Sequence, residues 1–569
     1  MNRLGWEFLV KQSHTERTIE SVDVAVIGGT PGGIAAALAA ARAGFRVALT
    51  EYHPHLGGMA TSGLGKSDNE NRDMIGGIFT EFVRRVWTYY ADTYGRDSVN
   101  AVLCNDGYYY EPSVAERIFN EMLAGQRTRI QVFPAHRLVS VRTAKNCVHQ
   151  ATLLSRASNS LLELNAKVFI DATYEGDLYA MAGAEYRLGR ESRDEYGELH
   201  AGVVYYDYEE RLFLPGTTGE ADRHLPAYTY RLCLTTDPKN SIALDSPPPE
   251  YDRQLYLPYL QDLRADRLSA PKRLVEGWGY YPKHFGTLLR AFSVTELPNG
   301  KIDANINPRP LAFLFSEEND GYADGDWDAR ERICLRHRHL TLGLLYFLQN
   351  DHAVPLAQRE MARQYGLPKD EFADNGHFPF QLYVREARRL VGEYTLTEHD
   401  VTSKEGIATT AYHEDSIAAG EFPVDSFPCR KCQPGDTRVL EGYLCMLDHI
   451  TRPYGIPYRI MIPRTIDGLI VPVAASATHV AYSSIRMEPT WMAMGQAAGT
   501  AAAVAIERAC SPRSVPITRL RQILRADGQV LEPLSSGART TIRMSAPQMV
   551  NVERPKAAEG IRNTSVARE

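Results

Sequence analysis

The chain has 569 residues, of which 44% are hydrophobic and 23% charged, and its formal net charge is -7. This is the composition of an ordinary soluble globular protein with enough apolar residues for more than one domain. The negative charge argues against a nucleic acid partner, and no apolar run reaches the roughly 20 residues of a membrane span.

The N-terminal residues 1–20 carry a short apolar patch that Glu7 interrupts, which makes a poor signal peptide and indicates a leader. Eight cysteines in so long a chain do not build a disulfide scaffold. We therefore expect a reducing, cytoplasmic setting.

Residues 22–51, VDVAVIGGTPGGIAAALAAARAGFRVALTE, predict a strand, a glycine turn, a helix from about Gly33 to Ala43, and a second strand that delivers Glu51. This order is typical of the βαβ unit that binds an adenine dinucleotide, with the pyrophosphate at the helix N-terminus and the ribose on the acid. Thr30 stands at the middle glycine position of the motif, where a side chain would crowd the pyrophosphate; the alternative is a βαβ unit without a ligand. The expected contacts are Gly28, Thr30, Pro31, Gly32, Gly33 and Glu51.

A second glycine pair follows in YHPHLGGMATSGLG and offers backbone to a large flat ligand, as a flavin dinucleotide requires. The expected contacts here are Tyr52, Gly57, Gly58, Met59 and Thr61. From this point the chain resembles the FAD-dependent oxidoreductases with a glutathione-reductase-type FAD domain. The blocks that carry the resemblance run from about residue 22 to about 505: VIGGTPGGIAAALAAARAG, LGGMATSGLG, IDATYEGDL, YVREARRLVGEY and HVAYSSIRMEPTWMAMGQAAGTAAA.

The resemblance implies an α/β fold with a discontinuous, Rossmann-like FAD-binding domain and an inserted α+β substrate domain. We expect the FAD domain at 21–187 and 411–535, the insert at 188–410, and a polar tail at 536–569. FAD is expected to be non-covalent, because nothing at the spacing of His53 and His55 demands a covalent link.

Further elements follow from periodicity. Residues 75–90 and the stretch after Pro112 predict helices, 130–141 predicts strands, and 166–172 predicts a buried strand. That strand ends at Asp171, which either faces the cofactor or, like Asp177, caps a turn. A helix is expected at 329–348 within the tyrosine-rich and proline-rich insert.

At the expected seam between the domains stand Arg385, Glu386, Arg388 and Arg389. The pattern favours an interdomain salt-bridge network, and the alternative is that one arginine faces the pocket.

Residues 467–475 predict the last core strand, and Pro489 suits the first position of the helix that follows. In the resembled fold, this helix points its N-terminus at the pyrimidine edge of the isoalloxazine, where its dipole stabilises the negative charge of the reduced flavin. The expected cofactor contacts are Gly495, Gln496 and Ala497, with Arg486 at the flavin edge or on a substrate oxygen. Glu488 is expected to cap the helix.

For the catalytic base, His479 is the first candidate, and its alternative is a histidine hydrogen-bonded within a loop. Tyr174 and His284 are further candidates for the pocket. Cys429, Cys432, Cys445 and His449 have the spacing of zinc ligands, but a local disulfide or free thiols fit the family context better.

No second dinucleotide motif and no redox cysteine pair are found, so we expect a small-molecule substrate to reduce the flavin and an unidentified acceptor to reoxidise it. The sequence therefore predicts an oxidoreductase that moves a hydride from an alcohol, sugar or amine to flavin N5. Two alternatives remain: a fumarate-reductase-like reductase of an activated C=C bond, and a protein that binds FAD for structure or sensing.

Overall fold

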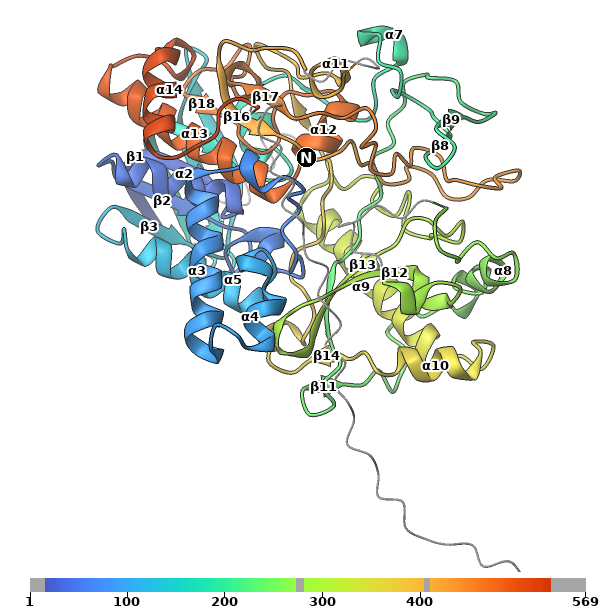
Figure 1. The fold of residues 1–569 in the computed structure, drawn as a ribbon. Helices are drawn as coiled ribbons and strands as arrows, with labels where there is room; N and C mark the ends of the chain where they lie inside the picture. The colour runs from blue at the N-terminus through green and yellow to red at the C-terminus, as the bar shows by residue number, and fades with distance from the viewer. Residues whose placement is uncertain (1–15, 273–280, 404–409, 534–569) are drawn as a thin grey trace, which may run out of the picture.

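A computed structural model describes residues 16–272, 281–403 and 410–533 of the protein. Elements from both ends of this range lie side by side, blue and red in Figure 1, and the central part of the chain, green and yellow, lies next to them. The fold is α/β and is built on a sheet with parallel strands.

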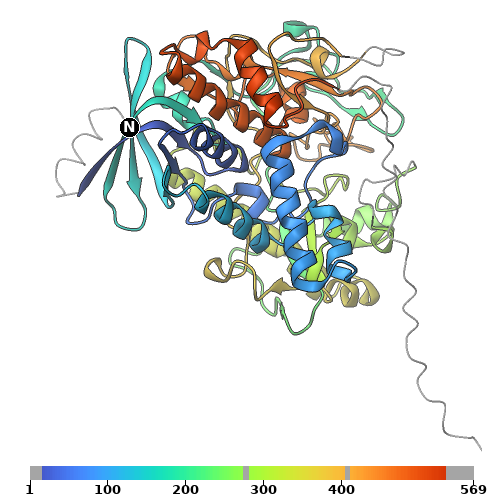
Figure 2. The same ribbon diagram turned by 60° about the vertical axis from the view of Figure 1, so that its left-hand side comes forward.

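The main sheet has seven strands in the order β3-β2-β1-β6-β5-β4, with β18 paired to β6. The parallel strands are β1 (Arg17–Ile27), β2 (Val47–Thr50), β3 (Ile130–Phe133), β6 (Leu161–Asp171) and β18 (Leu469–Ile470). The antiparallel strands β4 (His136–Ala144) and β5 (Cys147–Ser155) extend the sheet and fan out in Figure 2. Because β18 comes from residues far along the chain, the sheet is assembled from two separate segments.

Two helices cover one face of the sheet and pack unusually closely. They are α2 (Pro31–Arg42) and α13 (Glu488–Glu507). A Cβ atom built on Gly495 would lie 2.0 Å from the carbonyl oxygen of Gly32, and one on Gly499 would lie 2.1 Å from that of Ala36. The glycines are therefore needed because two backbones meet there.

We expect Gly495→Ala to destabilise the fold by about 1–3 kcal/mol, because the added methyl group meets backbone that cannot rotate away. The measurement is the midpoint of thermal unfolding. Gly125→Ala is the control, since its Cβ would be 3.3 Å from the nearest atom. Equal midpoints for both variants would contradict the close packing.

The remaining helices near the sheet are α3 (Gly77–Tyr94), α4 (Val99–Leu103), α5 (Pro112–Ala124), α6 (Asp177–Ala182), α12 (His479–Ile485) and α14 (Ile517–Ala526). The amphipathic patterns predicted at 75–90 and after Pro112 are confirmed by α3 and α5, whose apolar faces are buried.

The central part of the chain has its own small sheet, in the order β10-β13-β12. Its strands are β10 (Leu232–Thr235), β12 (Phe292–Glu296) and β13 (Lys301–Ile306), and its helices are α8 (Pro258–Arg264), α9 (Trp327–Asn350) and α10 (Leu356–Ala362). The helix predicted at 329–348 is confirmed by α9. None of the helices in the described ranges is long and apolar enough to cross a membrane.

Short elements complete the fold. The two-stranded pairs are β7 (Tyr186–Arg187) with β15 (Arg389–Leu390), β8 (Tyr206–Asp207) with β9 (Leu212–Phe213), β11 (Ser241–Ile242) with β14 (Leu367–Pro368), and β16 (Ser416–Gly420) with β17 (Tyr454–Pro457). The short helices are α7 (Arg193–Tyr196) and α11 (Glu398–Val401).

Two boundaries differ from the sequence predictions. The last core strand is only Leu469–Ile470, because Pro472 has no N–H to donate to a ladder. Residues 17–20, expected in the leader, belong to β1, because their backbone pairs in parallel with the start of β6. Residues 1–15 of the expected leader and the expected tail at 536–569 lie outside the described residues.

Candidate active site

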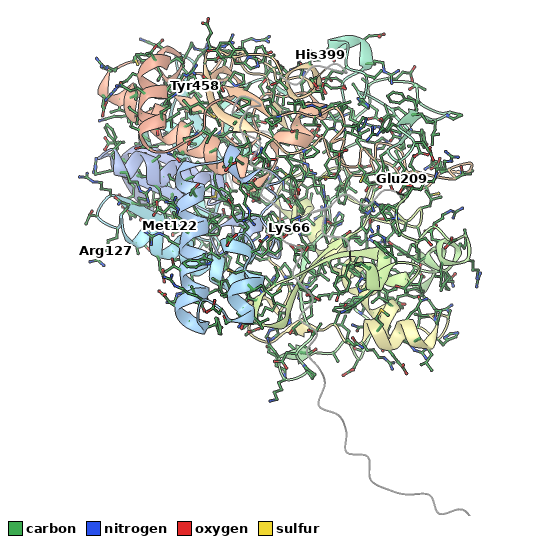
Figure 3. The ribbon with its side chains drawn as sticks, in the orientation of Figure 1. Lys66, Met122, Arg127, Glu209, His399 and Tyr458 are labelled. Carbon is green, nitrogen blue, oxygen red and sulfur yellow. The ribbon has the colours of Figure 1, made fainter. Side chains whose placement is uncertain are left out.

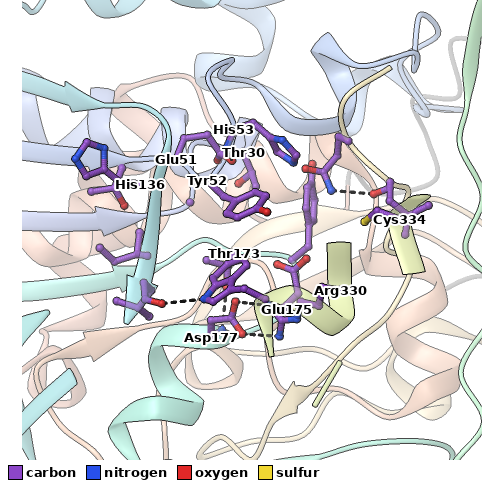
Figure 4. A pocket seen from close by; sticks show the side chains of 18 of the residues that line it. Thr30, Glu51, Tyr52, His53, His136, Thr173, Glu175, Asp177, Arg330 and Cys334 are labelled. Carbon is purple, nitrogen blue, oxygen red and sulfur yellow. Dashed lines mark hydrogen bonds and ion pairs between the residues drawn. The ribbon is translucent and has the colours of Figure 1, made fainter. Parts of the chain in front are cut away.

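The first recess is a cavity at the carboxyl ends of the parallel strands β1 and β2, where open α/β sheets bind their ligands. Figure 4 shows side chains from both parts of the chain around it. From the sheet region it is lined by Ile27, Gly28, Thr30, Thr50, Glu51, Tyr52, His53, His136, Leu138, Thr173, Tyr174, Glu175 and Asp177. From the central part it is lined by Tyr322, Trp327, Arg330, Glu331, Cys334, Phe380, Gln381 and Leu382.

Glu51 is held at the end of β2 by the turn that follows β1. Its Oε2 accepts a hydrogen bond from the backbone N–H of Gly29 at 2.7 Å, and its Oε1 accepts one from His53 at 3.0 Å. Burial raises the pKa of Glu51 to about 7. Each carboxylate oxygen has a second lone pair, so the group can still accept a hydrogen bond from a ligand hydroxyl.

Thr30 uses its hydroxyl within the protein. The hydroxyl donates to the carbonyl oxygen of Ala172 at 2.9 Å and accepts from the N–H of Gly33 at 3.2 Å. Thr30 is thus the N-cap of α2 and ties the turn to the end of β6. A side chain at the middle glycine position is accommodated because its polar atom is directed at the chain's own backbone.

Helix α9 closes the first recess from the central part of the chain. The indole of Trp327 stacks on the ring of Tyr52, with centroids 4.5 Å apart, and its N–H donates to the carbonyl oxygen of Leu138 at 3.1 Å. Arg330 forms a bidentate ion pair with Asp177 at 2.7 and 2.8 Å. Trp327 has no signal in the sequence, since one tryptophan in a helix carries no pattern.

The second recess is a larger cavity of about 1000 Å³ when the space open to solvent is included. Lys66, one of its lining residues, lies near the centre of Figure 3, where the blue N-terminal elements meet the green and yellow ones. The charged lining residues are Lys66, Asp68, Glu70, Arg231, Arg290, Arg309, Arg385, Asp425 and Arg486. Neutral polar side chains of Ser293, Thr295, Asn305, Asn307, Tyr383 and Tyr443 complete its polar surface.

Two segments pass from one recess to the other. Residues 51–53 line the first recess, and Lys66, Asp68 and Glu70 line the second. Between them lies the glycine-rich loop, residues 54–65. Gln381 and Leu382 line the first recess, whereas Tyr383 and Arg385 line the second. The two recesses are therefore neighbours along the same stretches of chain.

Tyr174 and Glu488 link the glycine-rich loop to the start of α13. The Tyr174 hydroxyl donates to Glu488 Oε1 at 2.6 Å and accepts from the N–H of Met59 at 3.0 Å. The prediction that Glu488 caps α13 is wrong: Met487 is the N-cap, and the Glu488 side chain is bonded to Tyr174 instead. Burial raises the pKa of Glu488 to about 8, and its Oε2 has no partner among the described residues.

The other cofactor contacts expected from the sequence surround these recesses without all lining them. Gly28, Thr30, Glu51 and Tyr52 line the first recess, and Arg486 lines the second. The others lie in the first turn of α2 (Pro31, Gly32, Gly33), in the loop between the recesses (Gly57, Gly58, Met59, Thr61), or in the second and third turns of α13 (Gly495, Gln496, Ala497). Gln496 accepts the backbone N–H of Ile78 at 2.8 Å and so anchors α3.

Asp171 lines neither recess. Its Oδ1 accepts from the N–H and hydroxyl of Thr173 at 3.1 and 2.7 Å, and its Oδ2 accepts from the N–H of Tyr179 at 2.9 Å. Burial raises its pKa to about 7. The residue therefore caps the turn after β6, which is the second of its two predicted roles.

His479 and His284, the two histidines expected in the pocket, are buried in the protein and line neither recess. Nδ1 of His479 lies 2.8 Å from Glu386 Oε2, and its Nε2 lies 3.5 Å from Ser426 Oγ. His284 Nε2 lies 3.0 Å from the hydroxyl of Tyr365, and burial lowers the pKa of His284 to about 4. Neither ring lines a recess.

Arg385, Arg388 and Arg389, the seam arginines, show both arrangements that the sequence left open: a salt-bridge network and an arginine that faces the pocket. Arg389 pairs with Glu191 at 2.7 Å and with Glu386 at 2.8 Å, and Arg388 pairs with Asp177 at 2.9 Å. Arg385 lines the second recess instead.

Asp425 is a residue of the second recess that sequence reasoning missed. Arg486 donates to its carbonyl oxygen at 2.7 Å and lies 3.4 Å from Oδ2, and the N–H of Met446 donates to Oδ1 at 3.3 Å. Burial raises the pKa of Asp425 to about 6, against the opposing effects of Arg486 and Arg385. Asp425 lies in an irregular, proline-rich stretch, where the sequence has no periodic pattern that would mark it as a site residue.

The possible zinc ligands do not converge. Cys429, Cys432 and Cys445 are free thiols. Nε2 of His449 lies 3.3 Å from the hydroxyl of Tyr206. Within the described ranges, no group of three or more His, Cys, Asp or Glu residues is arranged to hold a metal ion.

A search of curated proteins finds no match. Among solved structures, the chain is similar to L-proline dehydrogenase from P. horikoshii, with 19% identity over 32% of this chain and 26% of that one and a TM-score of 0.17. It is also similar to a geranylgeranyl bacteriochlorophyll reductase-like protein from Thermoplasma acidophilum, with 12% identity over 90% and 85% and a TM-score of 0.34. A third is THI4 of Thermovibrio ammonificans, with 20% identity over 33% and 72% and a TM-score of 0.21.

The chain spans only about a quarter of the length of the proline dehydrogenase chain, so that likeness concerns a part of each protein. The sequence profile of the family described as FAD dependent oxidoreductase, by contrast, matches residues 23–524, which is nearly all of the chain. This stretch includes the βαβ unit, both recesses and the helix α13. The chain therefore belongs to the FAD-dependent oxidoreductase family.

Proposed function

We propose that this enzyme oxidises a small organic molecule held in the second recess, by hydride transfer to FAD held between the two recesses. The observation that carries the proposal is that the recesses follow one another along residues 51–70 and again along residues 381–385. A ligand that begins at Glu51 and follows the glycine-rich loop therefore arrives beside Asp425 and Arg486.

The residues present fit FAD. The orphaned Oε2 of Glu488 is a buried polar atom that a ligand hydroxyl would satisfy, and the ribityl chain of FAD supplies such groups. Glu51 would bind the adenosine ribose, and the N-terminal turn of α2 would bind the pyrophosphate. Gly58 leaves no room for a side chain, because a Cβ there would lie 2.3 Å from the Tyr174 hydroxyl. When bound, the flavin supplies an acceptor for the hydride.

In the second recess, Asp425 is the group that takes the substrate proton. Its side chain is 18% exposed, and its raised pKa keeps it close to the pH at which a general base works best. His479 then becomes a positioning residue, since it contacts Ser426, the neighbour of Asp425, and is held by Glu386. This replaces His479 as the proposed base.

The electron acceptor in this proposal is a separate molecule, because the sequence has one dinucleotide motif. The free thiol state of all eight cysteines supports a reducing compartment such as the cytoplasm.

The test is the absorption spectrum of the purified holoenzyme during anaerobic addition of alcohols, sugars, amines and hydroxy acids. Bleaching of the flavin bands by one class of donor is the expected result. A different result would favour the reductase reaction instead. In that case no donor bleaches the flavin bands, and an enoate reoxidises the flavin after dithionite has reduced it. A protein that does not bind FAD at all would contradict the proposal.

A further inference from the structure

We infer that the second recess recognises its substrate through a carboxylate, so that the donor is an organic acid, such as a hydroxy acid, rather than a neutral alcohol or sugar. This inference rests on the proposed function for the oxidation step, but the binding of the anion stands independently of it. Its basis is a buried guanidinium, that of Arg385, which has no carboxylate within ion-pair distance among the described residues.

Arg385 is fully buried and lines the second recess. Its hydrogen bonds go to the carbonyl oxygen of Ala227 at 2.9 Å, the hydroxyl of Thr229 at 2.9 Å and Oδ1 of Asn305 at 3.4 Å. All three partners are neutral, and Nε has no partner among the described residues. Buried charges in proteins are normally paired, so this arrangement calls for an anion from outside.

The environment of Arg385 differs from that of its neighbours. Arg231 pairs with Asp303 at 2.7 Å, Lys66 with Glu70 at 3.7 Å, and Arg486 with Asp425 at 3.4 Å. The guanidinium of Arg385 lies instead against the ring of Phe427, with Cζ 3.4 Å from the centroid. Burial, with a further contribution from Arg486, lowers the pKa of Arg385 to about 9.

The guanidinium groups of Arg385 and Arg486 both lie close to the ring of Tyr383. Cζ of Arg385 is 4.3 Å and Cζ of Arg486 is 5.8 Å from the centroid of Tyr383, and Arg486 donates to the Tyr383 hydroxyl at 3.1 Å. A chain of contacts therefore runs from the proposed base Asp425 through Arg486 and Tyr383 to Arg385. A carboxylate on Arg385 would fix one end of a substrate near the group that takes its proton.

The acids in the same wall limit the charge of the ligand. The recess is lined by six cationic side chains and three acidic ones, so its positive excess is moderate. Asp68 and Asp425 would repel a dianionic phosphate ester more strongly than a carboxylate monoanion. Ser293, Thr295 and Asn305 offer hydrogen bonds to the hydroxyl groups of a polar acid.

The test titrates the FAD holoenzyme with matched pairs of probes, gluconate against sorbitol and glycolate against ethylene glycol, and reads the shift of the flavin absorption spectrum. We expect each acid to bind at least about 10-fold more tightly than its neutral partner. Arg385→Met should weaken acid binding about 10-fold to 100-fold, as loss of a charged hydrogen bond does. Arg385→Lys should recover part of the loss, and binding of the neutral partner should not change.

The outcomes separate the two proposals. Acids that shift the spectrum, in an enzyme whose flavin is reduced by no alcohol, sugar, amine or hydroxy acid of the donor panel, would uphold the carboxylate site and overturn hydride transfer. Neutral alcohols that reduce the flavin while no acid binds would uphold hydride transfer and overturn the carboxylate site. The comparison of acid with neutral partner needs only the unmodified holoenzyme, so it decides the question even where Arg385→Met fails to fold. Glucose 6-phosphate binding more tightly than gluconate would overturn the assignment to a carboxylate.

Discussion

Replacing Asp425 with asparagine is expected to slow reduction of the bound flavin by substrate about 100-fold to 10,000-fold, the usual effect of losing a general base. Asparagine keeps the shape and still accepts from the N–H of Met446, but it cannot take a proton. FAD affinity should be unchanged, because Asp425 lines the second recess and not the first. The measurement is single-turnover flavin reduction in an anaerobic stopped-flow instrument.

The dependence of the flavin reduction rate on pH tests whether Asp425 is the group that takes the proton. The base works when ionised, so the wild-type rate should rise with pH up to about 6, the pKa of Asp425, and level off above it. The charges that face the carboxyl are Arg486 and Arg385, which lower its pKa, and Asp68, which raises it. In Asp425→Asn, this rise should disappear.

Asp73→Asn is the matched control, because Asp73 is exposed and lines neither recess. It should keep both the rate and the profile. A rise with the same midpoint in Asp425→Asn would show that another group carries the proton. His479→Gln, by contrast, is expected to lower the rate without moving the midpoint, because its ring acts through Ser426.

The part of the site that the sequence predicts best is the part built from neighbours in sequence. The strand, turn, helix and acid of residues 22–51 follow from local patterns, because each step is decided by residues a few positions apart. The helix α13 was also predictable, since Pro489 and a run of small residues mark its start and its close packing. In both places, the residues expected at the site are also the ones that determine the local structure.

The second recess could not be predicted in this way. Arg385 and Asp425 are 40 positions apart and are joined through Arg486 and Tyr383, which only the folded chain brings together. The sequence is compatible with one of the three arginines Arg385, Arg388 and Arg389 facing the pocket, but no pattern in it distinguishes which one. The three arginines differ in their partners, because Arg388 and Arg389 have acids within 3 Å whereas Arg385 has none in the part of the chain that the structure describes.

His479 shows that position along the chain does not by itself assign a role. It stands between the last core strand and the helix α13, where a base is expected, but its ring packs against Glu386 and Ser426 inside the protein. Glu488 likewise stands at a helix start, where a capping role is expected, but its side chain accepts a hydrogen bond from Tyr174, 314 positions away. Position along the chain places a residue near a site, and only burial and partners decide its role.

The largest effect on stability is expected from Arg389→Met. The Arg389 side chain is fully buried and is paired with Glu191 at 2.7 Å and Glu386 at 2.8 Å, and it also donates to the carbonyl oxygen of Ala477 at 2.7 Å. Methionine fills a similar volume but removes the buried cation between two interior carboxylates. Among the described residues, this leaves Glu191 with only the longer 3.6 Å ion-pair contact to Arg187 and Glu386 with only the ring of His479. Removal of one partner from a buried ion pair costs about 3–5 kcal/mol.

Protonation of Glu191 does not restore the stability that Arg389→Met loses. Burial opposes its ionisation, but Arg389 and backbone N–H groups outweigh burial and hold the pKa of Glu191 below its usual value. One of those groups is the N–H of His479, which donates to Glu191 Oε2 at 3.0 Å. Once Arg389 is gone, Glu191 either stays charged in the interior or takes up a proton at neutral pH, and both routes cost free energy.

The measurement for Arg389→Met is urea unfolding of the holoenzyme followed by flavin fluorescence, with Arg117→Met as the control. Arg117 also pairs with a glutamate, Glu121, but the two side chains are 60% and 46% exposed, so that variant should unfold at the wild-type midpoint. Adding Glu191→Gln and Glu386→Gln to Arg389→Met should restore part of the loss, because the variant then buries amides in place of charges. If Arg389→Met and Arg117→Met unfold at the same urea concentration, the prediction is contradicted. The buried ion pairs of Arg389 with Glu191 and Glu386 would then stabilise the fold no more than an exposed ion pair does.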